Sequence, residues 1–383
     1  MNVVVPFGFF GAGNIGDEAM LQAFAGLIAH YHGGLRVWVA SRGPSHTARV
    51  VPSFKYYRAF GFDLRRRWAQ HRASGYALVG DTPIMDILGA WPLSEVAPLV
   101  CAAHDQRKPV VAVGIGTEKL EREQSRRVVS EILAPRVQHW SVRSERDKER
   151  LVSYGVEVER VTVAADLAWM LAAVPSDFGR KSLAALGLEG DGLLVGVNLT
   201  NEEFVRAREP RLFEKAGLAL DALIEKYEAR ILFFANEVRE DDNFDAVANR
   251  RALACMKHRE RAILIPNHYW TPQQMLALIG SCHLTIGMRY HFCLFSALQS
   301  VPFIAVKRSD KLEDLCWDLN WRYGLSLADL SEHALLEMSS DITTKRASII
   351  DCLQERVEMM RQRALRNNVA LETLISQACA LSA

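Results

Sequence analysis

The sequence predicts an α/β protein that contains two parallel-sheet domains in tandem. Short apolar runs alternate with stretches of helical length, which is typical of the strands and crossover helices of a parallel sheet. The alternation stops at residues 175–192, a stretch rich in Pro, Ser, Asp and Gly, and then starts again. The length of 383 residues also exceeds what one hydrophobic core usually serves.

Each element is predicted from its own apolar pattern. In the first half, strands are expected at 2–5, 36–40, 76–79, 110–114, 139–142 and 161–164, with helices between them, for example at 17–30, 95–106 and 124–136. In the second half, strands are expected at 193–199, 230–234, 262–265, 284–286 and 303–306, with helices at 213–227 and 272–281. Residues 341–382 carry apolar side chains at helical spacing and predict one or two long helices.

These elements define the expected domains. An N-terminal domain is expected over residues 1–178, a C-terminal domain over 190–335, and a helical tail over 336–383 that packs back on the domains. Open parallel sheets bind ligands at the carboxyl ends of their strands, so two such domains are expected to face a ligand cleft. The loops that follow strands are therefore the first places to look for functional residues.

Composition excludes several classes of function. Lys and Arg number 46 against 45 Asp and Glu, and a net charge of +1 gives no overall field for nucleic acid or an anionic membrane. The seven scattered cysteines indicate a reducing compartment. The N-terminus lacks the basic segment of a signal peptide, and no apolar run reaches the roughly 18 residues of a membrane span. A cytoplasmic location is expected.

A glycine loop follows the first predicted strand. Gly11–Gly16 fits G-x-G-x-x-G, and Arg42 after the second strand could meet a 2′-phosphate, which together would indicate an NADP-binding domain. Asp17 and Glu18 argue against this, because two carboxylates at the helix start would repel a pyrophosphate. A ligand rich in donors, such as sugar hydroxyls, or an intermediate that needs a base fits better. The remaining alternative is a plain turn in which Asp17 caps the helix.

A second cluster lies about three-quarters along the chain. Arg289 and His291 are two residues apart in a loop that follows a predicted strand, and the next strand is followed by Lys307, Arg308 and Lys311. Several cations and one titratable imidazole on adjacent loops are typical of a site for a small, multiply charged anion.

The cysteines near this cluster do not predict metal binding or nucleophilic catalysis. The spacing of Cys282, His283 and Cys293 is too irregular for a zinc site. The apolar neighbours of Cys293 would keep its thiol protonated.

The two clusters together resemble the polysaccharide pyruvyl transferase family. The resemblance runs to about residue 335 and rests on the sequence GAGNIGDEA at 11–19, VGIG at 113–116, Val142-Arg143 with Leu151, Gly155-Val156 and Ala164-Ala165-Asp166, and GMRYH at 287–291. Members of this family move pyruvate from phosphoenolpyruvate to a sugar as a ketal. The resemblance implies a fold like the two-domain GT-B glycosyltransferases, with two Rossmann-like domains facing a cleft and helices at the C-terminus.

The resemblance also implies roles for individual residues. Arg143, Arg289 and Lys311 correspond to donor-binding positions, and His291 to a general acid or base. Phosphoenolpyruvate is then the donor substrate, and no cofactor or metal is expected because the cations can offset its charge.

On the acceptor side, Asp17 is the second catalytic candidate, and Asn14, Glu18 and Asp81 are candidates for binding the saccharide. Two departures touch these regions: Val79-Gly80-Asp81-Thr82-Pro83 stands where the family has a run of glycines, and Ser144 replaces an Asp.

Other interpretations remain open. A glycosyltransferase that uses a nucleotide sugar would keep the same fold, and a degenerate family member would bind a saccharide without turnover. The basic run 63–72, with Trp68 inside it, is interpreted first as a solvated helix face. The alternative for this run is peripheral contact with the inner face of the membrane, or with the phosphates of a lipid- or nucleotide-linked sugar.

Overall fold

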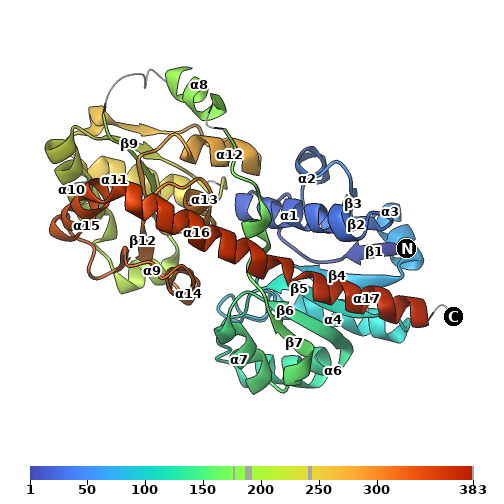
Figure 1. Ribbon diagram of the computed structural model, residues 1–383. Coiled ribbons are helices and arrows are strands. Elements are labelled where there is room, and N and C mark those ends of the chain that lie inside the picture. The colour runs from blue at the N-terminus through green and yellow to red at the C-terminus, as the bar shows by residue number, and fades with distance from the viewer. Residues whose placement is uncertain (176, 186–191, 240–243, 382–383) are drawn as a thin grey trace. The chain divides into compact units, whose positions relative to one another are not determined.

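The computed structural model describes residues 1–175, 177–185, 192–239 and 244–381, and it divides into two compact units (Figure 1). Unit 1 consists of Met1–Ala12, Asp17–Leu171 and Arg361–Ala383, and unit 2 of Gly13–Gly16 and Ala172–Met360. Each unit contains one parallel sheet with helices, so the predicted fold class is confirmed. Among the described residues, none of the helices combines the length and the apolar character needed to cross a bilayer.

Unit 1 is built on a seven-stranded sheet in the order β3-β2-β1-β4-β5-β6-β7, with every pairing parallel. The strands are β1 (Asn2–Val5), β2 (Arg36–Ser41), β3 (Lys55–Arg58), β4 (Gly75–Val79), β5 (Val110–Ile115), β6 (Val137–Val142) and β7 (Val161–Val163). The central strands are Val-rich and buried on both faces, as expected for a sheet covered by helices on each side.

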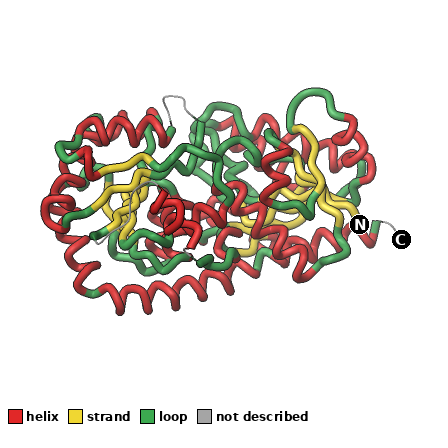
Figure 2. The backbone as a smooth tube through the Cα atoms, turned by 90° about the horizontal axis from the view of Figure 1, so that it is seen from above, coloured by secondary structure: helices red, strands yellow, loops and turns green. Residues whose placement is uncertain are grey.

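The helices of unit 1 cover both faces of this sheet (Figure 2). They are α1 (Ile15–Tyr31), α2 (Pro44–Val50), α3 (Leu64–Arg72), α4 (Leu93–Asp105), α5 (Glu123–Arg127), α6 (Ala134–Arg136), α7 (Glu145–Ser153) and α17 (Asn368–Ala380). A π-helical stretch, Val128–Leu133, joins α5 to α6, so the single helix predicted at 124–136 is present but not regular. Short 3-10 turns lie at Val158–Arg160 and Leu167–Met170.

Unit 2 contains a six-stranded parallel sheet in the order β10-β9-β8-β11-β12-β13. The strands are β8 (Leu194–Asn198), β9 (Arg230–Phe233), β10 (Ala262–Leu264), β11 (Leu284–Gly287), β12 (Phe303–Lys307) and β13 (Gly324–Ser326). The helices are α8 (Asp177–Ala185), α9 (Glu203–Arg208), α10 (Leu212–Tyr227), α11 (Asp245–Cys255), α12 (Pro272–Ile279), α13 (Tyr290–Leu298), α14 (Asp310–Asp318), α15 (Glu332–Thr344) and the first part of α16 (Arg346–Leu365). A 3-10 turn at Arg259–Arg261 precedes β10.

Two strands, β3 and β13, were not predicted from the sequence. Both lie at an edge of their sheet. Strand β3 begins and ends with exposed charged residues, and β13 contains one large apolar residue, Leu325, so neither shows the apolar run of a central strand.

The division between the units differs from the predicted domain boundaries. The first boundary falls between Leu171 and Ala172, not near residue 178, and the backbone N–H and C=O of Val174 both bond to the side chain of Gln299 in unit 2. The remainder of the predicted crossing, 186–191 together with residue 176, lies outside the described residues.

The C-terminal tail is shared between the units, with the division at Met360. Its last helix, α17, packs on β4, β5 and β6. Asn367, just before α17, is buried, donates to the carbonyl of Ala165 at 2.9 Å and accepts from the hydroxyl of Ser141. Leu374 is fully buried beside Gly75, where an added Cβ would lie 2.7 Å from its Cδ1.

Candidate functional site

Three polar loops meet at the carboxyl edge of the sheet in unit 2. Strand β11 pairs with β8 on one side and with β12 on the other, so the residues that follow these strands are neighbours. Glu202 lies in the loop after β8, Arg289 after β11 and Arg308 after β12, while Lys311 lies in the first turn of α14. This edge is where parallel sheets usually bind ligands.

The Glu202 carboxylate lies between two guanidinium groups. Arg289 Nη1 is 3.2 Å from Glu202 Oε1, and Arg308 Nη1 forms an ion pair with Oε2. The two arginine side chains are only 13% and 14% exposed. Burial opposes ionisation of Glu202, but the charges of Arg308, Arg289 and Lys311 outweigh burial and lower its pKa. The carboxylate is therefore ionised at neutral pH.

Asp245 holds the Arg289 side chain in place. Its buried carboxylate accepts from Arg289 Nε at 2.9 Å through Oδ1, and from Asn198 Nδ2 and the backbone N–H of Asn236, each at 2.9 Å, through Oδ2. Burial alone would lower the pKa of the Arg289 guanidinium, but the carboxylates of Asp245 and Glu202 raise it above its usual value. The guanidinium is thus permanently charged and held in one orientation.

The second half of the glycine loop belongs to unit 2. An antiparallel bridge joins Asn14 to Glu237, and the N–H of Val238 donates to the carbonyl of Gly13 at 2.9 Å. Gly13 has a φ of 107°, a conformation that side chains with a Cβ rarely adopt. Residues 13–15 of the loop therefore pair with residues 236–238 like a short strand.

His291 lies directly against Gly16. A Cβ on Gly16 would be 2.1 Å from His291 Nδ1, so only glycine allows this approach. The imidazole also makes an edge contact with Tyr290, with ring centroids 5.2 Å apart. This close packing is sufficient to explain why the third glycine of the motif is a glycine, and no bound phosphate is needed for that explanation. The catalytic role of His291 stays a prediction.

Arg143 lies in unit 1 at the end of β6. Its Nη2 donates to the carbonyl of Asp81 at 2.7 Å, its Nε donates to the carbonyl of Gly114 at 3.0 Å, and the same Nε is 3.1 Å from the buried Asp166 Oδ2. The side chain is only 10% exposed. These contacts join β5 to the loops that follow β4 and β7, and the predicted role of Arg143 in donor binding stays untested.

The four acceptor-side candidates have different surroundings. Asn14 Oδ1 accepts from the backbone N–H two residues further on, at 2.9 Å. Asp17 is buried in the first turn of α1, and Glu18 is fully buried and accepts from the backbone N–H of Gly11. Asp81 has a φ of 58° and its Oδ1 accepts from the next backbone N–H at 2.7 Å. Their roles in the reaction stay predictions.

The Ser144 departure has a local structural role. Ser144 caps the N-terminus of α7: its Oγ accepts from the backbone N–H of Asp147 at 3.2 Å and donates to Asp147 Oδ2 at 3.0 Å.

The cysteines near Arg289 are buried in apolar surroundings. Burial raises the pKa of the Cys282 thiol to about 12, and it raises the pKa of Cys293 well above its ordinary value. Both thiols are therefore protonated and poor nucleophiles. Within the part of the chain that the structure describes, no group of three or more His, Cys, Asp or Glu side chains could hold a metal ion.

Two residues of this site were not predicted from the sequence. Glu202 follows the predicted strand 193–199 in the sequence Asn-Leu-Thr-Asn-Glu, so its position after a strand was a usable signal. Asp245 gave no such signal, because its partner Arg289 is 44 residues away.

Comparison with known proteins places the chain in a family. The family model for polysaccharide pyruvyl transferase matches residues 14–310. The chain belongs to the polysaccharide pyruvyl transferase family. Among curated proteins none matches the sequence.

Solved structures confirm the GT-B-like fold. UDP-GlcNAc 2-epimerase from Neisseria meningitidis is similar with a TM-score of 0.66 and 11% identity, covering 98% of this chain and 100% of that one. Anabaena HepE in complex with UDP-glucose gives a TM-score of 0.64 and 13% identity, with 98% and 100% covered. A glycosyltransferase from Rickettsia africae gives a TM-score of 0.55 and 11% identity, with 99% and 96% covered. At these identities the likeness concerns the fold.

Proposed function

We propose that this member of the polysaccharide pyruvyl transferase family transfers the pyruvyl group of phosphoenolpyruvate to a saccharide, forming a ketal in the biosynthesis of a cell-surface polysaccharide. The observation that carries the proposal is the cluster of Arg289, Arg308 and Lys311 around Glu202 at the carboxyl edge of unit 2, with His291 two residues after Arg289 in the first turn of α13.

The charges of this cluster suit a small anion with a carboxylate and a phosphate. Three cations, Arg308, Arg289 and Lys311, act on Glu202, and Arg289 also pairs with Asp245. Asp245 is buried and stays with Arg289, whereas Glu202 is partly exposed. A bound anion would take over the contacts that Glu202 makes with the arginines, and charge-assisted hydrogen bonds to guanidinium favour that exchange.

The chemistry needs a proton donor and acceptor but no redox cofactor. A proton is added to the methylene carbon of phosphoenolpyruvate, and a sugar hydroxyl adds to the neighbouring carbon and loses its proton. The C–O bond to phosphate then breaks, phosphate leaves, and a second hydroxyl adds and loses its proton to close the ketal. His291 is the proposed group for these transfers because an imidazole ring can both donate and accept a proton. Asp17 is the proposed group that orients or deprotonates the acceptor hydroxyl.

Calorimetry and thermal unfolding test the donor. The full chain is titrated with phosphoenolpyruvate, UDP-glucose and NADPH in parallel, because a ligand that binds only the native state raises the melting temperature. We expect binding of phosphoenolpyruvate that weakens about 10- to 100-fold in Arg289→Lys, which loses the planar pair of donors. Arg211→Lys is the matched control, since Arg211 is exposed and pairs with Glu214 on the surface of unit 2.

Two outcomes contradict the proposal. Binding of UDP-glucose without binding of phosphoenolpyruvate would favour glycosyl transfer, the alternative that the GT-B-like fold also accommodates. Equal affinity for phosphoenolpyruvate in Arg289→Lys and Arg211→Lys would remove the proposed donor site from unit 2.

A further inference from the structure

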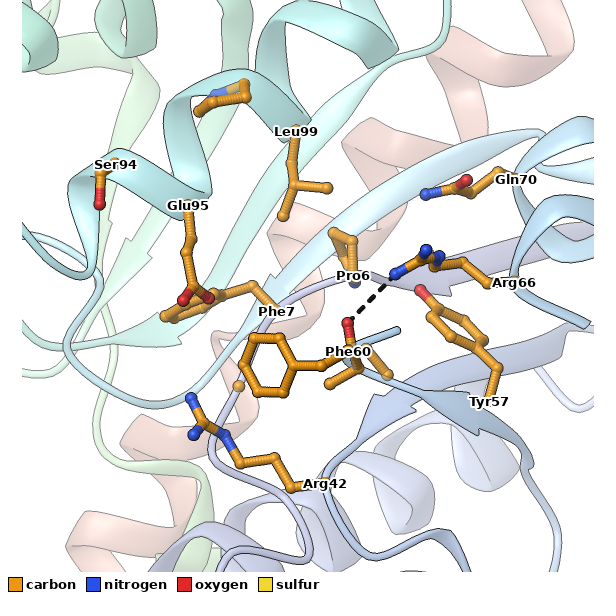
Figure 3. Close-up of a pocket in the computed structure, with 14 residues that line it drawn as sticks. Pro6, Phe7, Arg42, Tyr57, Phe60, Arg66, Gln70, Ser94, Glu95 and Leu99 are labelled. Carbon is orange, nitrogen blue, oxygen red and sulfur yellow. Dashed lines mark hydrogen bonds between the residues drawn. The ribbon is translucent and has the colours of Figure 1, made fainter. Parts of the chain in front are cut away.

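Unit 1 contains a pocket that none of the predicted catalytic, donor-binding or acceptor-binding residues lines, although Arg42 and two residues of the basic run, Arg66 and Gln70, do. Its volume is about 490 Å³, within the range of small-molecule sites. The walls come from the segments that follow β1, β2 and β3 and from α3 and α4 (Figure 3). The pocket therefore opens at the carboxyl edge of the sheet in unit 1, where parallel sheets bind ligands.

An exposed aromatic ring forms the centre of this pocket. Phe60 lies two residues beyond the end of β3 and is 53% exposed. The guanidinium carbon of Arg42 lies 4.7 Å from the centroid of the Phe60 ring and 4.1 Å from that of Phe9. Cation–π contacts with two rings orient the Arg42 side chain. An open aromatic face beside polar groups is suited to the apolar face of a sugar ring.

Polar groups flank Phe60 on both sides. In Figure 3, Glu95 and Arg42 approach Phe60 from one side, whereas Arg66, Tyr57 and Gln70 lie on the other. The carboxylate of Glu95 has no hydrogen-bond or ion-pair partner among the described residues, so its acceptor oxygens remain open to ligand hydroxyls.

The side of the pocket near Arg66 is preorganised for an anion. Arg66 donates from Nη2 to the carbonyl of Gly61 at 2.7 Å and from Nη1 to that of Ala59 at 3.3 Å, which fixes the guanidinium and leaves further N–H donors. The hydroxyl of Tyr57 is buried and has no partner within the described part of the chain, and Figure 3 shows it directed toward Arg66. A phosphate oxygen at Arg66 would give this buried donor an acceptor.

We propose that this pocket binds a glycosyl phosphate unit of the acceptor, with the sugar ring against Phe60, sugar hydroxyls on Glu95 and the phosphate on Arg66. That the ligand is the acceptor of the reaction rests on the proposed function, whereas the binding of a glycosyl phosphate in this pocket does not. The phosphate could belong to a nucleotide-linked or to a lipid-linked sugar, because both present the same glycosyl phosphate.

Saturation-transfer NMR on the full chain tests the site with three hexose 1-phosphates (glucose, galactose and mannose), the free hexoses and inorganic phosphate. We expect one hexose 1-phosphate to bind at millimolar concentration and to bind at least 10-fold more weakly in Phe60→Ala. Glu95→Gln is expected to weaken the hexose 1-phosphate and its free hexose alike. Arg66→Lys is expected to weaken only the phosphorylated sugar, which separates the two ends of the pocket.

The matched controls are Phe62→Ala and Arg67→Gln. Phe62 is 73% exposed and lies in the same segment, and neither residue lines the pocket. Both variants are expected to bind like the parent chain. Competition by UDP-glucose and by a short-chain polyprenyl-phosphate glucose distinguishes the nucleotide-linked source from the lipid-linked source.

The outcomes separate this inference from the proposed function. The proposed binding site is overturned if none of the three hexose 1-phosphates binds, or if they bind equally to Phe60→Ala and Phe62→Ala. This holds whether or not phosphoenolpyruvate binds. Hexose 1-phosphate binding that is lost in Arg289→Lys and kept in Phe60→Ala also overturns it, because the ligand is then in unit 2. Loss of phosphoenolpyruvate binding alone contradicts the proposed function and leaves the pocket standing.

Discussion

Gly16 should be the most informative position for testing the role of His291. In Gly16→Ala the new Cβ would lie 2.1 Å from His291 Nδ1, whereas ordinary van der Waals contact begins at 3.4 Å. The imidazole must therefore move by about 1.3 Å. Since a misplacement of about 1 Å can cost about 100-fold in rate, we expect turnover to fall by about that factor.

Stability should change much less than activity. Alanine gains up to about 1 kcal/mol over glycine within a helix, and overpacking costs about 1–3 kcal/mol, so the net loss in the free energy of unfolding should be about 0–2 kcal/mol. Gly26→Ala is the control on the same helix, because an added Cβ there meets no atom within 4 Å. That variant should match the parent in activity and be at least as stable.

Two measurements check this prediction. Phosphate release from phosphoenolpyruvate, with the hexose 1-phosphates as acceptors, reports turnover. The imidazole NMR resonances of His291, assigned by their absence in His291→Asn, report the displacement whatever the reaction proves to be. Turnover of Gly16→Ala within three-fold of Gly26→Ala, or an unmoved His291 resonance, would refute the reasoning.

Four further predictions concern charge and packing. Glu202→Gln should bind phosphoenolpyruvate more tightly in calorimetry, because the competing carboxylate is lost. The native state lowers the pKa of Glu202, so its ionisation stabilises the fold above pH about 4.5. Urea titrations should show that this contribution to the free energy of unfolding is lost as the pH falls through the lowered pKa. A difference in the free energy of unfolding between the parent chain and Glu202→Gln that does not change with pH would contradict this prediction. Arg143→Ala should lose about 3–5 kcal/mol in the free energy of unfolding because the buried Asp166 carboxylate loses the guanidinium that lies 3.1 Å from it, and adding Asp166→Asn should recover part of the loss; no recovery would mean that the pair does not matter. Leu374→Ala should cost about 2–5 kcal/mol in urea unfolding, against less than about 0.5 for the exposed Leu381→Ala, and equal losses would show that α17 does not pack on unit 1.

The sequence by itself determined the fold class and most of the elements. Strand β1 was predicted with its observed ends, and the central strands were predicted within about two residues, because strands buried on both faces need continuous apolar runs. Of the four edge strands of the described sheets, β7 and β10 were predicted, whereas β3 and β13 were missed because neither contains a continuous apolar run. The motifs at 11–19 and 287–291 were sufficient for the family, which the match over residues 14–310 confirms.

Only the tertiary structure decided how the candidate site is held together. The sequence predicted Arg289 as a cation for an anionic donor, but its pairing with Asp245 and Glu202 spans 44 and 87 residues, and no local pattern encodes contacts at such separations. The glycine loop was interpreted as a ligand-binding turn, whereas Gly16 is small because His291 lies against it, 275 positions later in the chain. Local composition determines which segments are strands and helices, since that depends on near neighbours. The protonation and orientation of buried charges depend on distant partners, which become neighbours only when the chain has folded.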